Sequence, residues 1–275
     1  MYPTAPPPAY QPVAPAEVTA PFSPYPRIAW IWVHFRDPRD GQEWSTSGTG
    51  VFLDNDAVLT CAHIFSEGGL NRIAYVEVFP AHNTARPADS GPPDGGVRAE
   101  WVQVCEAQLA TRDKRDDFSW DFALVCLATP LVFRNVPSFV LEADEYLNQD
   151  PAYQGDGSVL RTAGYGGTPG LLTQVNAPVD YADYGAHWFS ITRASQPGHS
   201  GSPVFHASTD AFKRAEYRLV GVLSCQDASD HGKTLIAMIN DRTKNWIERA
   251  MSEWSTEKRR RLVRVTALRG RPVGV

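Results

Sequence analysis

The chain has 275 residues, of which 43% are apolar and 21% charged, and these fractions exclude a chain that is disordered throughout. Its net charge of −5 argues against a general nucleic-acid binder. No apolar run approaches the roughly 18 residues that a membrane span requires.

The first 26 residues contain nine prolines, and the first basic side chain is Arg27. A secretory signal begins with basic residues and continues into an apolar run of about 7–15 residues, a pattern that this stretch lacks. We therefore expect residues 1–26 to form an extended or disordered arm. A solvated tail is the simplest role for this arm, and a docking peptide for a partner is the alternative. The expected location is cytoplasmic, or secreted if the chain is a mature fragment.

None of the four cysteines belongs to a C-x-x-C pair, which argues against a structural zinc site. They are Cys61, Cys105, Cys126 and Cys225. Cys126 lies within an apolar run, where a buried free thiol is the ordinary case. Without an export signal we expect reduced cysteines, and two disulfides are the alternative for a mature fragment.

From residue 27 onward, short apolar stretches rich in β-branched and aromatic residues alternate with turns rich in Gly, Pro and Asp. Many short strands separated by such turns predict an all-β sandwich or barrel. The predicted strands lie at 28–35, 50–53, 57–60, 73–79, 119–127, 159–164, 188–193, 203–205, 218–224 and 234–239. Residues 80–96 hold four prolines and three glycines and are expected to form a surface loop.

One helix is expected near the C-terminus, where Asn240 or Asp241 can accept a hydrogen bond from a free N–H of the first turn. Five apolar residues recur at helical spacing and predict a face that packs on the β core. They are Trp246, Ile247, Ala250, Met251 and Trp254. Residues 251–275 then carry seven Lys or Arg against two Glu. Such a run is usually a solvated tail, so residues 252–275 are expected to be a basic extension; contact with the acidic body, a membrane surface or nucleic acid is the alternative.

The most informative segment, residues 196–203, reads Gln-Pro-Gly-His-Ser-Gly-Ser-Pro. Glycines on both sides of Ser200 allow a sharp turn that exposes its hydroxyl. The same turn can aim the N–H groups of Gly198 and Ser200 at one point, which is what a tetrahedral oxyanion needs. A plain Gly/Ser loop is the alternative.

Two further segments offer partners for this serine. His63 follows the predicted strand 57–60, so its imidazole can lie at the edge of the core. Asp121 opens the apolar run 122–127, where a partly buried carboxylate must be paired. An imidazole N–H would satisfy it and would leave the other ring nitrogen free to accept a proton. Asp116 and Asp117 are rival carboxylates, but they stand in a polar run.

In this order, His, Asp and Ser, the three segments resemble the trypsin-like serine peptidases. The Gly-x-Ser-Gly-Ser-Pro form is shared with the bacterial glutamyl-endopeptidase branch, and residues 238–247 are similar to its last strand and closing helix. The resemblance covers about residues 28–251. It implies an all-β fold of two antiparallel six-stranded barrels, at 27–142 and 143–251, the second with a closing C-terminal helix.

The resemblance also implies a serine endopeptidase acting on a protein or peptide substrate, with no metal and no cofactor. Ser200 would be the nucleophile, and His63 the general base and then the general acid for the leaving amine. Asp121 would orient His63, and the N–H groups of Gly198 and Ser200 would form the oxyanion hole. A catalytically inactive relative, used as a binding or regulatory module, is the alternative.

The sequence departs from the animal enzymes at His199, where they have an Asp that pairs with a freshly cleaved N-terminal amine. We therefore expect the full-length chain to be competent without cleavage at Arg27.

A second departure concerns the P1 pocket. Ala194, six residues before the nucleophile, supplies no carboxylate for Arg or Lys. Ser195 can offer a hydroxyl, and Leu223 stands where the glutamyl branch has a histidine. We expect narrow specificity with a small or apolar P1 residue in preference to Glu.

A positive charge for a Glu side chain could come only from elsewhere, with His187, His199 and His231 as candidates. Beside the pocket, main-chain groups of Ser224 and Gln226 would pair with an extended substrate.

Overall fold

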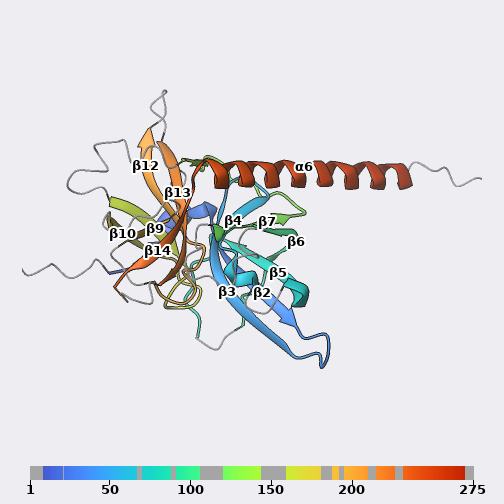
Figure 1. Cartoon of the computed structure of the whole chain (residues 1–275), viewed down its shortest axis with the longest axis horizontal. Coiled ribbons are helices and arrows are strands. Elements are labelled where there is room, and N and C mark those ends of the chain that lie inside the picture. Colours follow the sequence, from blue (N-terminus) through green and yellow to red (C-terminus); the bar gives the residue numbers. More distant parts are fainter. Residues whose placement is uncertain are drawn as a thin grey trace, which may run out of the picture.

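The structure is a computed structural model, and it describes residues 9–20, 22–66, 70–87, 91–105, 120–143, 159–180, 188–191, 195–209, 215–226 and 232–269. Two β units lie beside each other, and a long C-terminal helix begins where they meet and runs over one of them (Figure 1). The all-β class with one closing helix is confirmed.

The first unit is a closed barrel of six strands in the order β2-β3-β4-β7-β6-β5. Their bounds are β2 Ile28–Arg36, β3 Glu43–Phe52, β4 Ala57–Thr60, β5 Ile73–Pro80, β6 Val97–Val104 and β7 Ala123–Leu127. Alternate residues of β2, among them Ile31, Val33 and Phe35, are buried in its core. The predicted N-terminal barrel is thus confirmed, although the sequence did not indicate β6, whose residues are mostly half-exposed.

The second unit is an eight-stranded sheet in the order β1-β10-β11-β14-β13-β12-β9, in which β9 also pairs with β10 and β8 pairs with β13. Their bounds are β1 Gln11–Pro12, β8 Phe139–Leu141, β9 Val159–Gly164, β10 Thr173–Asp180, β11 Trp188–Ile191, β12 Pro203–Thr209, β13 Ala215–Gln226 and β14 Thr234–Met238. A six-stranded unit was predicted here. The additional strands β1 and β8 come from the N-terminal arm and from the passage between the units, and both are too short to be read from a sequence pattern.

The N-terminal arm differs from the prediction. Within its described part, a short helix α1 (Pro15–Val18) and a 3₁₀ turn η1 (Tyr25–Arg27) follow β1. Val13, Val18 and Tyr25 are buried and join a cluster with Trp30 and Tyr165. The expectation of a solvated arm is therefore wrong for these residues, because the apolar side chains between the prolines pack against the body.

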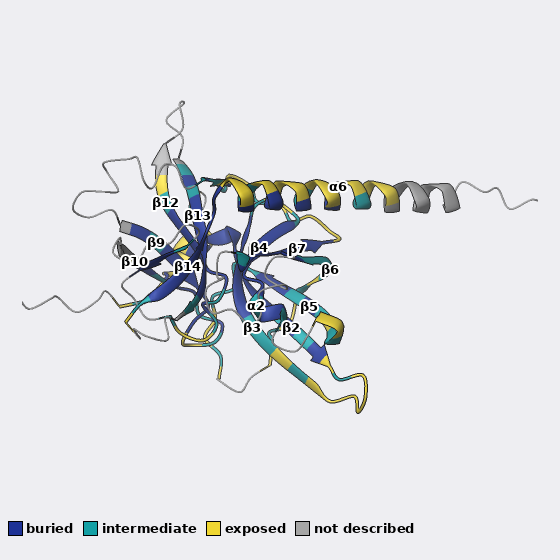
Figure 2. Cartoon of the chain, in the orientation of Figure 1, coloured by how far each residue is buried: buried dark blue, intermediate teal, exposed yellow. Residues whose placement is uncertain are grey.

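Helix α6 runs from Asp241 to Arg269. Asn240 caps it, since its Oδ1 accepts hydrogen bonds from the N–H groups of Arg242 and Thr243, both at 3.0 Å. The predicted apolar face is buried against the core that joins the two units, as the dark stripe on the helix shows (Figure 2).

The C-terminal extension is helical where a solvated tail was predicted. The ring of Trp254 stacks on Trp101 with a centroid distance of 6.0 Å. The Lys258 ammonium pairs with Asp56 of the first barrel. The expected boundary at residue 252 is therefore wrong, because packing on the barrel continues for nearly two more turns. The helix then extends past the barrel (Figure 1).

None of the four cysteines, which all lie within the described ranges, forms a disulfide, and three of them are buried. None of the helices in the described ranges combines the length and the hydropathy needed to cross a bilayer.

Candidate active site

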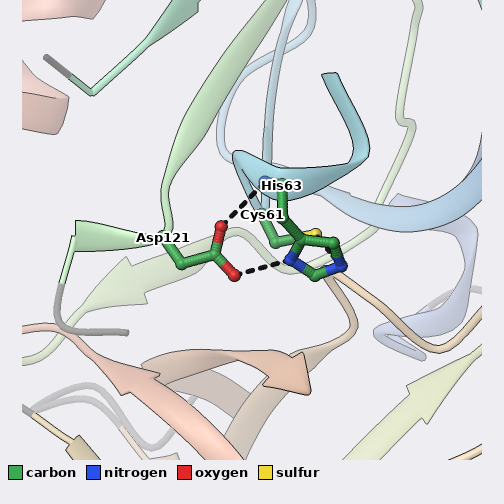
Figure 3. Close-up of side chains that lie close together, drawn as sticks. All are labelled: Cys61, His63 and Asp121. Atoms are coloured by element: carbon green, nitrogen blue, oxygen red, sulfur yellow. Dashed lines mark hydrogen bonds and ion pairs between the residues drawn. The ribbon is translucent and has the colours of Figure 1, made fainter. Parts of the chain in front are cut away.

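His63 and Asp121 come together through the pairing of two strands of the first barrel. His63 begins helix α2 (His63–Ser66) directly after β4, and Asp121 precedes β7, the neighbour of β4. The Asp121 side chain is 1% exposed. Its Oδ1 accepts hydrogen bonds from the N–H groups of Ala62 and His63 at 2.8 Å each, and its Oδ2 accepts one from His63 Nδ1 at 2.7 Å (Figure 3).

Ser200 comes from the second unit, in the turn before β12. Its Oγ lies 2.9 Å from His63 Nε2. Because the Nδ1–H group donates its hydrogen bond to Asp121, Nε2 is the nitrogen that accepts the hydrogen bond of the serine hydroxyl. The structure thus brings the three sequence-predicted residues into one hydrogen-bonded chain. The rival carboxylates Asp116 and Asp117 lie outside the described residues.

A fourth side chain joins the hydrogen bonds of Ser200, His63 and Asp121. Ser224 of β13 is buried, and its hydroxyl donates a hydrogen bond to Oδ2 of Asp121. From the sequence, only the main-chain groups of Ser224 were expected to act, because its side-chain contact joins residues 103 positions apart.

The negative charge of Asp121 and the positive charge of the His63 imidazolium stabilise each other. Burial alone would raise the pKa of Asp121, but the positive charge of the His63 imidazole and the hydrogen bonds from His63 and Ser224 outweigh it, so the pKa is lowered. Burial alone would lower the pKa of His63, but the negative charge of Asp121 and its hydrogen bond to Nδ1 raise it above its ordinary value. The Cys61 sulfur lies 3.8 Å from His63 Nε2. Burial raises the pKa of that thiol, so it is uncharged near pH 7 and the negative charge beside the imidazole is that of Asp121.

Cys61, His63 and Asp121 present donor atoms within 4.8 Å of one another, the spacing of a metal site (Figure 3). Both ring nitrogens of His63 already have partners in Asp121 and Ser200. A hydrogen-bonded chain therefore accounts for the cluster, and no step of a mechanism needs an ion there.

The turn before Ser200 has the backbone shape that its glycine allows. His199 N–H donates to the carbonyl of Gln196 at 3.0 Å, and Gly198 has φ +94°, so the four residues form a type II turn with Pro197 second. A Cβ on Gly198 would lie 2.2 Å from the Tyr165 carbonyl oxygen, so only glycine fits.

Thr49 of β3 fastens this turn to the first barrel. Its hydroxyl donates to the Gly198 carbonyl at 2.8 Å and accepts from the Tyr165 N–H at 2.9 Å. Its own N–H donates to the Ser200 carbonyl at 2.7 Å. A threonine between two glycines carries no local sign of this role.

A cavity of about 440 Å³ opens beside the hydrogen-bonded residues Ser200 and His63. Gly198, Trp30 and residues 45–47 of β3 also line it. A larger one, of about 590 Å³, lies between the N-terminal arm and strands β9 and β10 and contacts none of these catalytic candidates.

The predicted specificity residues are brought to the site only in part. Ser195 is half-buried beside the turn, and Ala194 lies outside the described residues. Leu223 is fully buried in an apolar cluster of the second unit and is absent from the lining of the 440 Å³ cavity. On β13, pairing with β12 ends at Val222, which leaves the strand from Ser224 onward without a β12 partner at the cleft.

The histidines proposed as a source of positive charge do not supply one among the described residues. His199 is 0% exposed and engages Thr173 and Gln196 through its two ring nitrogens. That suggestion is therefore wrong for His199, because its ring is buried beneath the turn of residues 196–199, where both ring nitrogens already have partners. His187 and His231 lie outside the described residues.

Known proteins resemble this chain in family and in fold. The family model described as "Trypsin-like peptidase domain" matches residues 48–211. A solved structure of a Glu endopeptidase in complex with MPD matches with a TM-score of 0.60 and 16% sequence identity, covering 88% of this chain and 96% of that chain. At that identity the likeness concerns the fold alone. The comparison with curated proteins gave no match.

Proposed function

The chain belongs to the family of trypsin-like peptidases and is a serine endopeptidase, and from this premise we propose that it hydrolyses peptide bonds through Ser200, His63 and Asp121 with an acyl-enzyme intermediate. The observation that carries the proposal is the unbroken series of hydrogen bonds from the Ser200 hydroxyl through the imidazole to the buried carboxylate.

In the acylation step, Ser200 Oγ attacks the carbonyl carbon of the scissile bond while its proton passes to His63 Nε2, 2.9 Å away. The carbonyl oxygen becomes an oxyanion. When the tetrahedral species collapses, the C–N bond breaks and the leaving amine takes the proton from Nε2. Water then attacks the acyl-enzyme in the same way, giving its proton to Nε2, and the returning proton releases Ser200.

The oxyanion would be stabilised by the N–H groups of Gly198 and Ser200. Within the described residues neither N–H donates to another protein group. Two free amides at the mouth of the 440 Å³ cavity are therefore available to a developing negative charge.

Asp121 would hold the imidazole in the tautomer with the proton on Nδ1 and stabilise the imidazolium that forms. Ser224 supports this role, because its hydrogen bond keeps the carboxylate ionised and fixes its orientation.

For specificity we propose a small or apolar P1 residue and a narrow substrate range. Ala194 carries no charge, and Leu223, which is buried in an apolar cluster, brings no cation to the site. Within the described residues the β12–β13 ladder ends at Val222, and this supports strand-like pairing of the following β13 main chain with an extended substrate. The cytoplasmic location and partner docking through residues 1–26 or 252–275 stay predictions.

The test combines a fluorophosphonate probe with peptide-library cleavage. We expect one covalent adduct, mapped by mass spectrometry to Ser200, and cleavage after small or apolar residues. Ser200→Ala should lose both the adduct and hydrolysis while its thermal unfolding is unchanged. A folded wild-type protein that neither reacts nor cleaves would favour the inactive binding module instead.

A further inference from the structure

The N-terminal arm reaches the residue next to the nucleophile. The ring of Tyr10 stacks on the imidazole of His199, with centroids 4.0 Å apart and planes inclined by 29°. His199 stands between Gly198 and Ser200, the two residues whose N–H groups face the proposed oxyanion.

The side chain of His199 holds the turn closed from beneath. The N–H of Gln196 donates to its Nδ1 at 3.2 Å, so the first residue of the turn is tied to the last. Its Nε2 lies 3.0 Å from the Thr173 hydroxyl, which donates in turn to the Gly164 carbonyl. The imidazole also lies against Gly166. A Cβ there would come within 2.3 Å of the ring, so the ring occupies the space that a side chain at residue 166 would need.

Tyr10 is itself fixed by its neighbours in the chain. Gln11 and Pro12 form β1 and pair with Gln174 and Thr173 of β10. Val13 follows, fully buried, and its N–H donates to the Leu172 carbonyl at 2.9 Å. The Val13 carbonyl accepts a hydrogen bond from the Asn83 amide at 3.0 Å. The tyrosine ring is therefore delivered to His199 by an ordered segment.

We propose that Tyr10 of the N-terminal arm is a positioning residue that, through His199, keeps the oxyanion turn in its working shape. This inference rests on the proposed function. The contact is made by a side chain inside the arm, so it needs no free amine.

The test compares three full-length variants. Tyr10→Ala removes the ring, Tyr10→Phe keeps it, and Gln11→Ala changes the adjacent exposed residue of β1 as a matched control. We expect kcat for peptide cleavage to fall by about 10- to 100-fold in Tyr10→Ala with KM changed less than about twofold, because loss of one oxyanion donor alone costs about 10²–10³. The other two variants should stay within about twofold of the wild type.

Two further readouts separate this inference from the proposed function. Affinity for a peptide boronate, which forms a tetrahedral adduct, should fall in Tyr10→Ala in parallel with kcat. Amide hydrogen exchange in the peptide spanning residues 195–203 should accelerate in Tyr10→Ala only, whether or not the protein cleaves peptides. Unchanged exchange and kcat in Tyr10→Ala, an equal loss in Tyr10→Phe, or a loss confined to KM would overturn the inference. If the wild-type protein has no activity but amide exchange is still faster in Tyr10→Ala, the proposed function is refuted and the positioning contact stands.

Discussion

Thr49→Val probes the link between the first barrel and the oxyanion turn. Valine has nearly the shape of threonine but cannot form hydrogen bonds. The substitution leaves the Gly198 carbonyl and the Tyr165 N–H without their partner at a fully buried position. An unsatisfied buried group costs about 1–3 kcal/mol. Because Gly198 is half-buried and its carbonyl can recruit water, we expect a total loss of about 2–4 kcal/mol in the free energy of unfolding.

The catalytic effect of Thr49→Val should exceed what lost stability explains. With its anchor gone, the peptide that carries the Gly198 carbonyl can rotate, and the resulting change in the backbone of Gly198 turns its N–H away from the oxyanion. The value of kcat should therefore fall by roughly 10- to 100-fold at a temperature where the variant is fully folded. Thr49→Ser keeps the hydroxyl and should retain kcat within about twofold.

Thr243→Val is a matched control for this experiment. Thr243 is also buried, and its hydroxyl bonds to backbone groups at the start of α6, remote from the turn. We expect it to lower the free energy of unfolding, measured by urea denaturation, without lowering kcat. A Thr49→Val protein with wild-type kcat, or a Thr243→Val protein that loses kcat equally, would refute the reasoning.

Two predictions concern pH. The proposed base His63 acts only when neutral and its pKa is raised beside Asp121, so kcat/KM should fall as pH drops, with a midpoint above the ordinary histidine value of about 6.5; a pH–rate profile with a lower midpoint would contradict this. Burial alone would raise the pKa of Glu142, but hydrogen bonds from His206 at 2.6 Å and Arg218 at 2.9 Å lower it. This carboxylate therefore contributes stability above its unfolded pKa, about 4.5, and loses the contribution as pH falls through its folded pKa. In urea titrations the stability difference between wild type and Glu142→Gln should be constant near neutral pH and shrink on acidification; a difference that grows in acid would count against it.

Local patterns were enough to predict the chemistry-bearing segments. Apolar runs ending in His63 and beginning at Asp121, and the glycine-flanked Ser200, carry their meaning within a few residues. The same is true of most strands and of the apolar face of α6, because burial on one side imposes a period on the sequence.

Only the tertiary structure decided which side chains support the catalytic candidates His63, Asp121 and Ser200. The Ser224 hydroxyl on Asp121, the Thr49 hydroxyl on Gly198 and the Tyr10 ring on His199 each join residues a hundred or more positions apart. Such contacts depend on strand register and on how the two units and the arm pack. A hydroxyl or a ring has no periodicity that reveals its partner, so these roles emerge only when the backbone has been folded.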